Sequence, residues 1–194
     1  TNASSISATV QKIWESAGKI DLLINNAGFG LMGPLAEIPL GEVRRQFETN
    51  VMGPLALVQA VIPYMVKQGG GRIVNVGSAS GVLTTPFSGA YSASKAALHS
   101  LSDAMRMEMA PFGIEVITLQ PGKIASKFGD TAARILRELV PPNSLYSPII
   151  RFMEKRALAS QSGATKATEI ARQVVRAVTG NRLPRLLRLG KYSW

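Results

Sequence analysis

The chain of 194 residues is 46% hydrophobic and 18% charged, which fits one globular domain with a substantial core and argues against disorder. The absence of cysteine excludes disulfides, thiolate catalysis and sulfur-ligated metals, and a single histidine leaves little for a zinc site, so we expect no metal. The formal charge of +10 accompanies only 6% aromatic residues, so we expect solvated basic side chains or an anionic ligand or lipid surface, and no nucleic-acid partner.

Four helices are predicted in chain order, and each leads into an apolar run of strand length. Glycines after the first two helices supply their stops. The helices and the strands that follow them are expected at 6–17 and 20–26, 41–67 and 72–77, 89–110 and 114–119, and 166–178 and 184–190. Because strands that are apolar throughout are typical of a parallel sheet with helices on both faces, the predicted fold class is α/β, doubly wound.

The stretch between 123 and 163 interrupts this alternation, because it mixes apolar and basic residues with several prolines. Insertions of this kind after the carboxyl end of a strand commonly cover a ligand. We therefore expect a single domain over residues 1–194, in which residues 123–163 form a substrate-covering segment.

Tyr91 and Lys95 lie four residues apart on a predicted helix, so their side chains emerge on one face about one turn apart. We expect the lysine ammonium to favour the phenolate and to lower the pKa of Tyr91 from its usual value of about 10, which makes the phenol a usable proton donor and acceptor. The alternative is a chance pair on an exposed helix, since both residues are common on surfaces. His99, two turns beyond Tyr91, is assigned no catalytic role.

Ser78 follows the strand predicted at 72–77, at the carboxyl end where open α/β sheets bind ligands. Its hydroxyl can orient a carbonyl oxygen, and Ser80 competes for this role on chemistry alone. Either serine can instead act as a turn former or helix cap. With Ser78 nearby, the pair of Tyr91 and Lys95 becomes a candidate for proton transfer.

Pro54 falls inside the helix predicted at 41–67 and has no N–H for the carbonyl four residues earlier, which belongs to Asn50. That free oxygen can hold a water that connects a lysine to solvent. An equal alternative is that Pro54 only bends the helix around the core.

Glycines at 28, 30 and 33 have the G-x-G-x-x-G spacing of a dinucleotide-binding turn. We reject that assignment, because the turn must open a helix, whereas Pro34 and Pro39 follow and no acidic residue lies on a strand at the required distance. These glycines are expected to turn the chain or to let the backbone approach a ligand.

A set of short motifs, in this order and spacing, resembles the short-chain dehydrogenase/reductase family over most of residues 1–128. The motifs are NNAG at 25–28, Asn50 within ETNVMG, Ser78, YSASK at 91–95 and PG at 121–122. Ser78 lies 13 residues before Tyr91, as the family's catalytic serine does, which favours it over Ser80. The resemblance implies a Rossmann-like fold and an NAD(P)-dependent oxidoreductase that transfers hydride between a cofactor and a carbonyl or alcohol.

The resemblance also implies a role for each matched residue. Tyr91 is the general acid that protonates the carbonyl oxygen, and Ser78 polarises that oxygen. Lys95 lowers the pKa of Tyr91 and binds the nicotinamide ribose, while Asn50 holds the relay water through its carbonyl. The implied cofactor-binding residues are Asn26, Ala27 and Gly28 near the adenosine side, Tyr91 and Lys95, and Pro121, Gly122, Ile124 and Ser126 at the nicotinamide, with Ser126 in place of a commoner threonine.

Within the family, the segments at 33–39, 95–103, 110–116 and 155–161 look most like the acyl-dihydroxyacetone-phosphate reductase branch. This similarity implies a lipid-type ketone reduced by NADPH, which we expect rather than NAD although the residues that discriminate the two are absent. Hydroxysteroid and retinol dehydrogenases share much of the pattern and are the alternative. The resemblance further implies a homodimer or homotetramer formed through the helices at 41–67 and 89–110.

No apolar run of about 18 uncharged residues is expected to span a bilayer, and the first residues lack the pattern of a secretory signal. We therefore expect a cytoplasmic protein, or one peripheral to an intracellular membrane, that is not secreted.

The family's glycine-rich phosphate loop, T-G-x-x-x-G-x-G, does not occur in this sequence. Two βαβ units sharing a strand would add about 60 residues before Thr1, so we expect a chain truncated at its N-terminus, and at its C-terminus as well. It would be a partial domain lacking the first β-α-β-α-β portion and the pyrophosphate site, with an apolar strand edge exposed at 20–26. The alternative function for such a fragment is a catalytically inactive binding or dimerising module.

Overall fold

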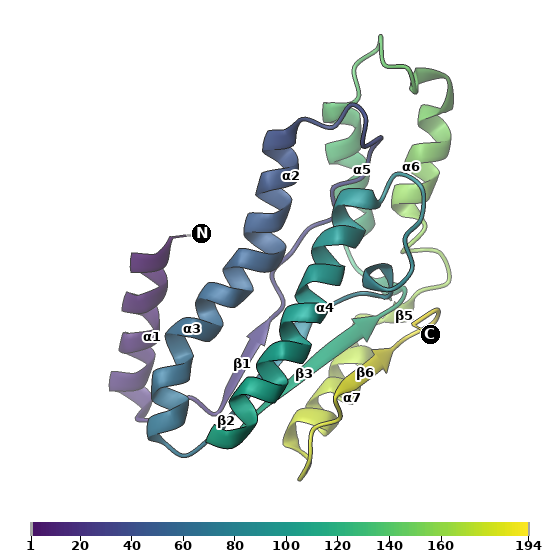
Figure 1. The fold of residues 1–194 in the computed structure, drawn as a ribbon. Helices are drawn as coiled ribbons and strands as arrows, with labels where there is room; N and C mark the ends of the chain where they lie inside the picture. The colour runs from purple at the N-terminus through teal and green to yellow at the C-terminus, as the bar shows by residue number, and fades with distance from the viewer. Residues whose placement is uncertain (1, 194) are drawn as a thin grey trace.

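A computed structural model describes residues 2–193 and shows a four-stranded sheet in the order β1-β2-β3-β6 (Figure 1). Neighbouring strands are all parallel. The strands are β1 (Leu22–Asn25), β2 (Gly71–Val76), β3 (Ile114–Pro121) and β6 (Leu186–Leu189). The predicted α/β class and its parallel sheet are therefore confirmed, with strand bounds within a few residues of those expected.

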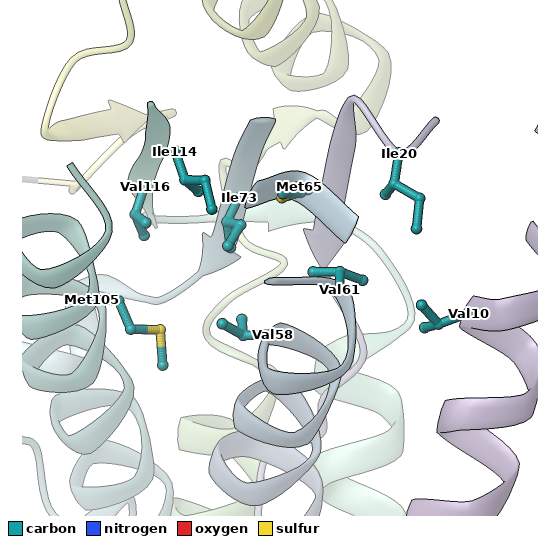
Figure 2. Packing of buried hydrophobic residues seen from close by; sticks show 9 residues of the cluster. All are labelled: Val10, Ile20, Val58, Val61, Met65, Ile73, Met105, Ile114 and Val116. Carbon is teal, nitrogen blue, oxygen red and sulfur yellow. The ribbon is translucent and has the colours of Figure 1, made fainter. Parts of the chain in front are cut away.

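Helices cover both faces of the sheet (Figure 1). Successive side chains of a strand point to opposite faces, so the apolar strands have apolar side chains to bury on each face. On one face lie α1 (Ala3–Ala17), α3 (Gly53–Lys67) and α4 (Gly89–Met109), and on the other lies α7 (Ala167–Thr179). The core on the first face comprises Val10, Ile20, Val58, Val61, Met65, Ile73, Met105, Ile114 and Val116 (Figure 2). The core on the second face comprises Val74, Ile117, Leu119, Ile170, Val178 and Leu189.

The helix predicted at 41–67 is continuous from Leu40 to Lys67, but its middle is π-helical. It consists of α2 (Leu40–Phe47), a π-helical turn (Glu48–Met52) and α3. By length and composition this helix could cross a membrane, which corrects the expectation that no such run exists. In this fold it is a core helix, since Val58 and Val61 are buried against the sheet (Figure 2).

The segment at 123–163 is more regular than its sequence suggested. It contains α5 (Phe128–Leu139) and α6 (Ile150–Leu158), and a short strand β4 (Ile124–Ala125) that pairs in parallel with β5 (Thr165–Lys166). Its prolines lie outside the interiors of these helices, at 141 and 142 after α5 ends and at 148 in a 3₁₀ turn before α6. Proline is compatible with helix ends, so the prolines mark boundaries and do not exclude helices.

Two smaller features concern the start of the described chain. The first helix begins at Ala3, three residues before the predicted start, because the Asn2 side chain accepts a hydrogen bond from the backbone N–H of Ser5 at 3.1 Å. Strand β1 lies at one edge of the sheet, with Leu22 and Ile24 exposed by 37% and 47%. The apolar strand edge expected at 20–26 is thus present.

Candidate active site

The segments that follow the strands meet at one edge of the sheet because all four strands run in the same direction. A cavity of about 1100 Å³ opens there, lined by these segments and by parts of α5, α6 and α7. Small-molecule sites commonly have about 300–1,000 Å³. The cavity therefore has room for a substrate together with the reacting part of a cofactor.

The structure brings most of the predicted site residues to this cavity. Those that line it are Asn26, Gly28, Ser78, Tyr91, Lys95, Pro121, Gly122, Ile124 and Ser126. Ala27 and Asn50 are not among the lining residues. Asn50 lies behind them and binds the backbone of Phe29, which does line the cavity. Ser80, the competitor of Ser78, also lines the cavity.

The side chains of Ser78 and Tyr91 interact, and this interaction lowers the pKa of Tyr91. Ser78 caps the 3₁₀ turn at 79–81, where its hydroxyl oxygen accepts a hydrogen bond from the backbone N–H of Ser80 at 3.1 Å. This contact uses the backbone of Ser80 to orient Ser78. Of the two serines, Ser78 is the one whose side chain interacts with Tyr91.

The expected lowering of the Tyr91 pKa is wrong for this structure. Burial raises the pKa of Tyr91 to about 12, and the hydrogen bond with Ser78 offsets only part of that rise. The Lys95 ammonium lies 5.9 Å from the centroid of the Tyr91 ring, too far to outweigh the loss of solvent around the phenolate. Tyr91 is consequently a neutral phenol at neutral pH, which suits it to donate a proton.

Lys95 is buried one helical turn beyond Tyr91 on α4. Its Nζ donates a hydrogen bond to the carbonyl oxygen of Val76, at the end of β2, over 2.7 Å. Burial lowers the pKa of Lys95 to about 8, because the charged form loses its solvation. The ammonium is thus anchored at the strand end and titrates near physiological pH.

Asn50 is fully buried in the π-helical turn, and its side chain holds the loop after β1. Its Oδ1 accepts from the backbone N–H of Phe29 at 3.2 Å, and its Nδ2 donates to the carbonyl oxygen of Phe29 and to Ser94 Oγ, each at 3.1 Å. A Cβ placed on Gly28 would lie 3.0 Å from Asn50 Oδ1 and 3.6 Å from Lys95 Nζ. Glycine at position 28 therefore lets Asn50 and Lys95 converge behind the cavity.

Pro54 stands in the first turn of α3, directly after the π-helical turn. In that turn the backbone N–H of Gly53 reaches the carbonyl oxygen of Glu48, five residues back. The wider turn keeps the helix continuous through the proline. A relay water on the carbonyl of Asn50 remains a prediction.

The rejection of a dinucleotide turn at glycines 28, 30 and 33 is confirmed, because the next helix begins only at Leu40. Gly30 instead permits close packing, since a Cβ there would lie 2.6 Å from the ring of Phe128. That ring lies 5.3 Å from the Tyr91 ring, measured between centroids. Phe128 thus connects the loop to the proposed proton donor.

Gln46 is a site-forming residue that sequence reasoning missed. It is fully buried, and its side-chain amide binds the backbone of the loop at two points. Nε2 donates to the carbonyl oxygen of Phe29, and Oε1 accepts from the N–H of Leu31, both at 2.7 Å. Its position four residues before Asn50, on the same helix face, was the available signal.

His99 supports Ser78, although the sequence assigned it no role. Its Nε2 accepts a hydrogen bond from the backbone N–H of Ser78 at 3.2 Å. The approach requires glycine at position 77, where a Cβ would lie 2.0 Å from His99 Nε2. Burial lowers the pKa of His99, with Lys95 acting in the same direction. The i, i+4 spacing from Lys95 was the overlooked signal.

The lining residues fit the ring and ribose of a nicotinamide cofactor. The Lys95 ammonium has three N–H donors, and Val76 accepts one of them, which leaves donors for sugar hydroxyls. Gly122 and Ile124 supply backbone and an apolar contact at the end of β3. A glycine-rich turn that opens a helix to receive phosphates is absent from residues 2–193.

Comparison with known proteins agrees with this geometry. The family model for short chain dehydrogenases matches residues 1–134. The chain is 40% identical over 147 residues to 3-ketodihydrosphingosine reductase of Bacteroides thetaiotaomicron, which covers 76% of this chain and 54% of that protein. It is 32% identical over 181 residues to ketoacyl reductase HetN of Nostoc sp., covering 91% and 63%. The chain thus spans about half the length of the curated relatives it matches.

Solved structures with a similar fold belong to the same class of proteins. A short-chain dehydrogenase from Streptomyces avermitilis is 28% identical, with a TM-score of 0.81 over 99% of this chain and 68% of that one. A short chain dehydrogenase/reductase from Burkholderia phymatum, solved in complex with NAD, is also 28% identical, with a TM-score of 0.80 over 95% and 67%.

Proposed function

The chain belongs to the short-chain dehydrogenase/reductase family of oxidoreductases, and we propose that the intact protein reduces a ketone to an alcohol with NADPH. By the intact protein we mean one of the full length of the curated relatives, of which this chain spans about half. The observation that carries the proposal is that Ser78, Tyr91 and Lys95 line one cavity at the strand ends, where Ser78 and Tyr91 interact and Lys95 lies one turn further along α4.

The residues of the site divide the chemistry between them. A bound nicotinamide cofactor supplies the hydride that adds to the carbonyl carbon. Tyr91, a neutral phenol, donates its proton to the carbonyl oxygen, and the Ser78 hydroxyl donates a hydrogen bond to the same oxygen. Lys95 would hold the ribose, and its ammonium, with a pKa of about 8, can pass a proton toward Tyr91. The Asn50 carbonyl would hold the water that refills this path.

The substrate class we propose is a ketone that carries a long hydrocarbon chain, with acyl-dihydroxyacetone phosphate as the specific candidate. Two relatives carry names of reductases for ketones of this kind, 3-ketodihydrosphingosine and ketoacyl compounds. Apolar side chains of the cavity wall, including Phe29, Met32, Leu83 and Phe128, supply a surface for an acyl chain. The similarity of the sequence to the acyl-dihydroxyacetone-phosphate reductase branch supports both this substrate and NADPH.

We further propose that the intact protein is a homodimer or homotetramer, which works in the cytoplasm or at the surface of an intracellular membrane. The helices at 40–67 and 89–109 carry exposed apolar side chains that association would cover, among them Leu40, Met52, Val66 and Met107. The basic surface of the chain, with its net charge of +10, supports contact with anionic lipid.

The proposal is tested by Tyr91→Phe in the intact protein. Removing the phenolic hydroxyl removes the proton donor and leaves the ring in place, so we expect ketone reduction to fall by about 10²–10⁴-fold. NADPH affinity should stay within about twofold, because the nicotinamide ribose is held by Lys95. The measurements are NADPH oxidation for the rate and NADPH fluorescence for binding.

Tyr64→Phe is the matched control, because Tyr64 lies on α3 with its ring 5.0 Å from that of Trp14 and does not line the cavity. The control should keep wild-type rates. A Tyr91→Phe variant that retains activity within about tenfold of wild type would refute the role of Tyr91.

A further inference from the structure

The charges that line the cavity all have one sign. Four cationic side chains face it, Lys95, Lys123, Lys127 and Arg156, and none of its lining residues is aspartate or glutamate. Within residues 2–193, none of the four forms an ion pair with a carboxylate. Cations gathered in a largely apolar hollow attract anions more strongly than cations on an open surface. The cavity therefore favours a negatively charged ligand.

Arg156 differs from the three lysines in its location and surroundings. Lys95 is bound to the end of β2, and Lys123 lies over the ring of Tyr192 at 4.7 Å from its centroid. Arg156 comes from α6 and is half-buried, and its guanidinium donates a hydrogen bond to the hydroxyl of Thr85. Burial without a carboxylate partner lowers the pKa of Arg156. Four N–H donors of the guanidinium remain for a ligand.

A hydrogen-bond network fixes the position of Thr85. Ser88 Oγ donates to the carbonyl oxygen of Thr85 at 2.7 Å and lies 2.9 Å from the Thr85 hydroxyl. The same Ser88 Oγ lies 3.2 Å from Ser92 Oγ in the first turn of α4. The Arg156 contact is therefore tied to the helix that carries Tyr91. A site whose side chains are positioned before binding loses less entropy when a ligand arrives.

Arg156 approaches the cavity on the side of Tyr91. The next residue, Ala157, is buried in one cluster with Tyr91, and Phe128 packs against that cluster. Gly122 and Ile124, which we propose to contact the cofactor, lie instead just after β3 and in β4. A ligand with its carbonyl between Ser78 and Tyr91 would thus have Arg156 within the same wall of the cavity.

We propose that Arg156, together with Thr85, binds an anionic group, phosphate or carboxylate, that the ketone substrate carries beyond its reacting carbonyl. The inference rests on the proposed function for the identity of the carbonyl. A guanidinium matches both anions, because its N–H donors form a planar fork that pairs with two oxygens. The apolar wall beside it accommodates the chain of the same molecule.

The test compares ketones with one acyl chain and different charge in the intact protein. The substrates are an acyl-dihydroxyacetone phosphate, a 3-oxo acid and the uncharged acyl-dihydroxyacetone. In Arg156→Met we expect KM for at least one anionic ketone to rise about ten- to hundredfold, the effect of losing charge-assisted hydrogen bonds. KM and kcat for the uncharged ketone and the Kd of NADPH should stay within about twofold. Whichever anionic ketone is affected identifies the anion.

Arg151→Met is the matched control, because Arg151 lies on the same helix, is exposed and does not line the cavity. It should leave all three KM values unchanged. The inference is overturned if Arg156→Met leaves both anionic ketones unaffected, if it impairs charged and uncharged ketones equally, or if it weakens NADPH binding instead.

A binding measurement separates this inference from the proposed function. Calorimetry of wild type and Arg156→Met uses an acylglycerol phosphate and the matching uncharged acylglycerol, neither of which has a ketone to reduce. If the intact protein reduces no ketone yet wild type prefers the phosphate by about tenfold or more and the variant does not, the anion site stands and the proposed reduction fails. Equal affinity of wild type for both ligands, with ketone reduction intact, overturns a phosphate-binding Arg156.

Discussion

Lys95→Met should stabilise the fold while abolishing activity. The fall in the Lys95 pKa from its usual 10.5 to about 8 corresponds to about 3 kcal/mol of unfavourable desolvation at pH 7. Replacement by methionine removes this cost, and it also removes the hydrogen bond to the Val76 carbonyl, which contributes about 1 kcal/mol. We therefore expect the free energy of unfolding at pH 7 to increase by about 2 kcal/mol. Ketone reduction should be lost, because the variant has no ammonium for the ribose.

The lowered pKa of Lys95 also predicts how the free energy of unfolding changes with pH. Between pH 8 and 10.5 the unfolded chain keeps a proton on Lys95 that the folded protein has released, so the free energy of unfolding of the wild type rises with pH. Tyr91 acts oppositely above pH 10, since the folded phenol keeps its proton to about pH 12. Urea unfolding followed by circular dichroism between pH 7 and 9.5 isolates the lysine.

Lys127→Met is the control for this experiment, because Lys127 is exposed whereas Lys95 is buried. The rise of stability with pH should persist in this control and vanish in Lys95→Met. The reasoning is refuted if Lys95→Met is no more stable than wild type at pH 7. It is also refuted if the free energy of unfolding of Lys95→Met rises between pH 7 and 9.5 as much as that of the wild type.

Two further predictions concern the support of Ser78. In Gly77→Ala the new Cβ would lie 2.0 Å from His99 Nε2 and 2.9 Å from the carbonyl oxygen of Leu119. We therefore expect the free energy of unfolding, measured with urea, to fall by about 1–3 kcal/mol, and kcat to fall as well. A wild-type free energy of unfolding together with a wild-type kcat would show that Ser78 tolerates a shift. Because folding lowers the pKa of His99 below its usual 6.5, the free energy of unfolding should fall as the pH drops below about 6.5. His99→Gln keeps a hydrogen-bond acceptor that does not titrate, so this fall should be smaller in the variant. An equal fall in wild type and variant, measured by urea unfolding, would contradict the prediction.

Much of the fold was predictable because its signals are local. The strand predicted at 72–77 is observed at Gly71–Val76, since a short apolar run bounded by glycines leaves few alternatives. The mixture of apolar and basic residues with prolines at 123–163 does not predict the helices at 128–139 and 150–158. Where a proline lies relative to the ends of a helix depends on where the helix starts, and the sequence alone did not show this.

The candidate site was predictable where its residues share one element. Tyr91 and Lys95 lie on one helix, and Ser78 follows the strand beside it, so spacing sufficed. The contact of Arg156 with Thr85 joins residues 71 positions apart, and its existence depends on the path of α5 and α6 over the cavity. No short stretch of the sequence predicts such a path.

The direction of the Tyr91 pKa shift has the same origin. Sequence spacing identifies a neighbouring cation but not the depth of burial, and burial is the larger effect at Tyr91. With its pKa at about 12, forming the phenolate at pH 7 would cost about 7 kcal/mol. Proton donation starts from the neutral phenol and forms the phenolate as its product, whereas proton abstraction by Tyr91 needs the phenolate beforehand. The neutral phenol of Tyr91 is thus the protonation state from which reduction of a ketone starts.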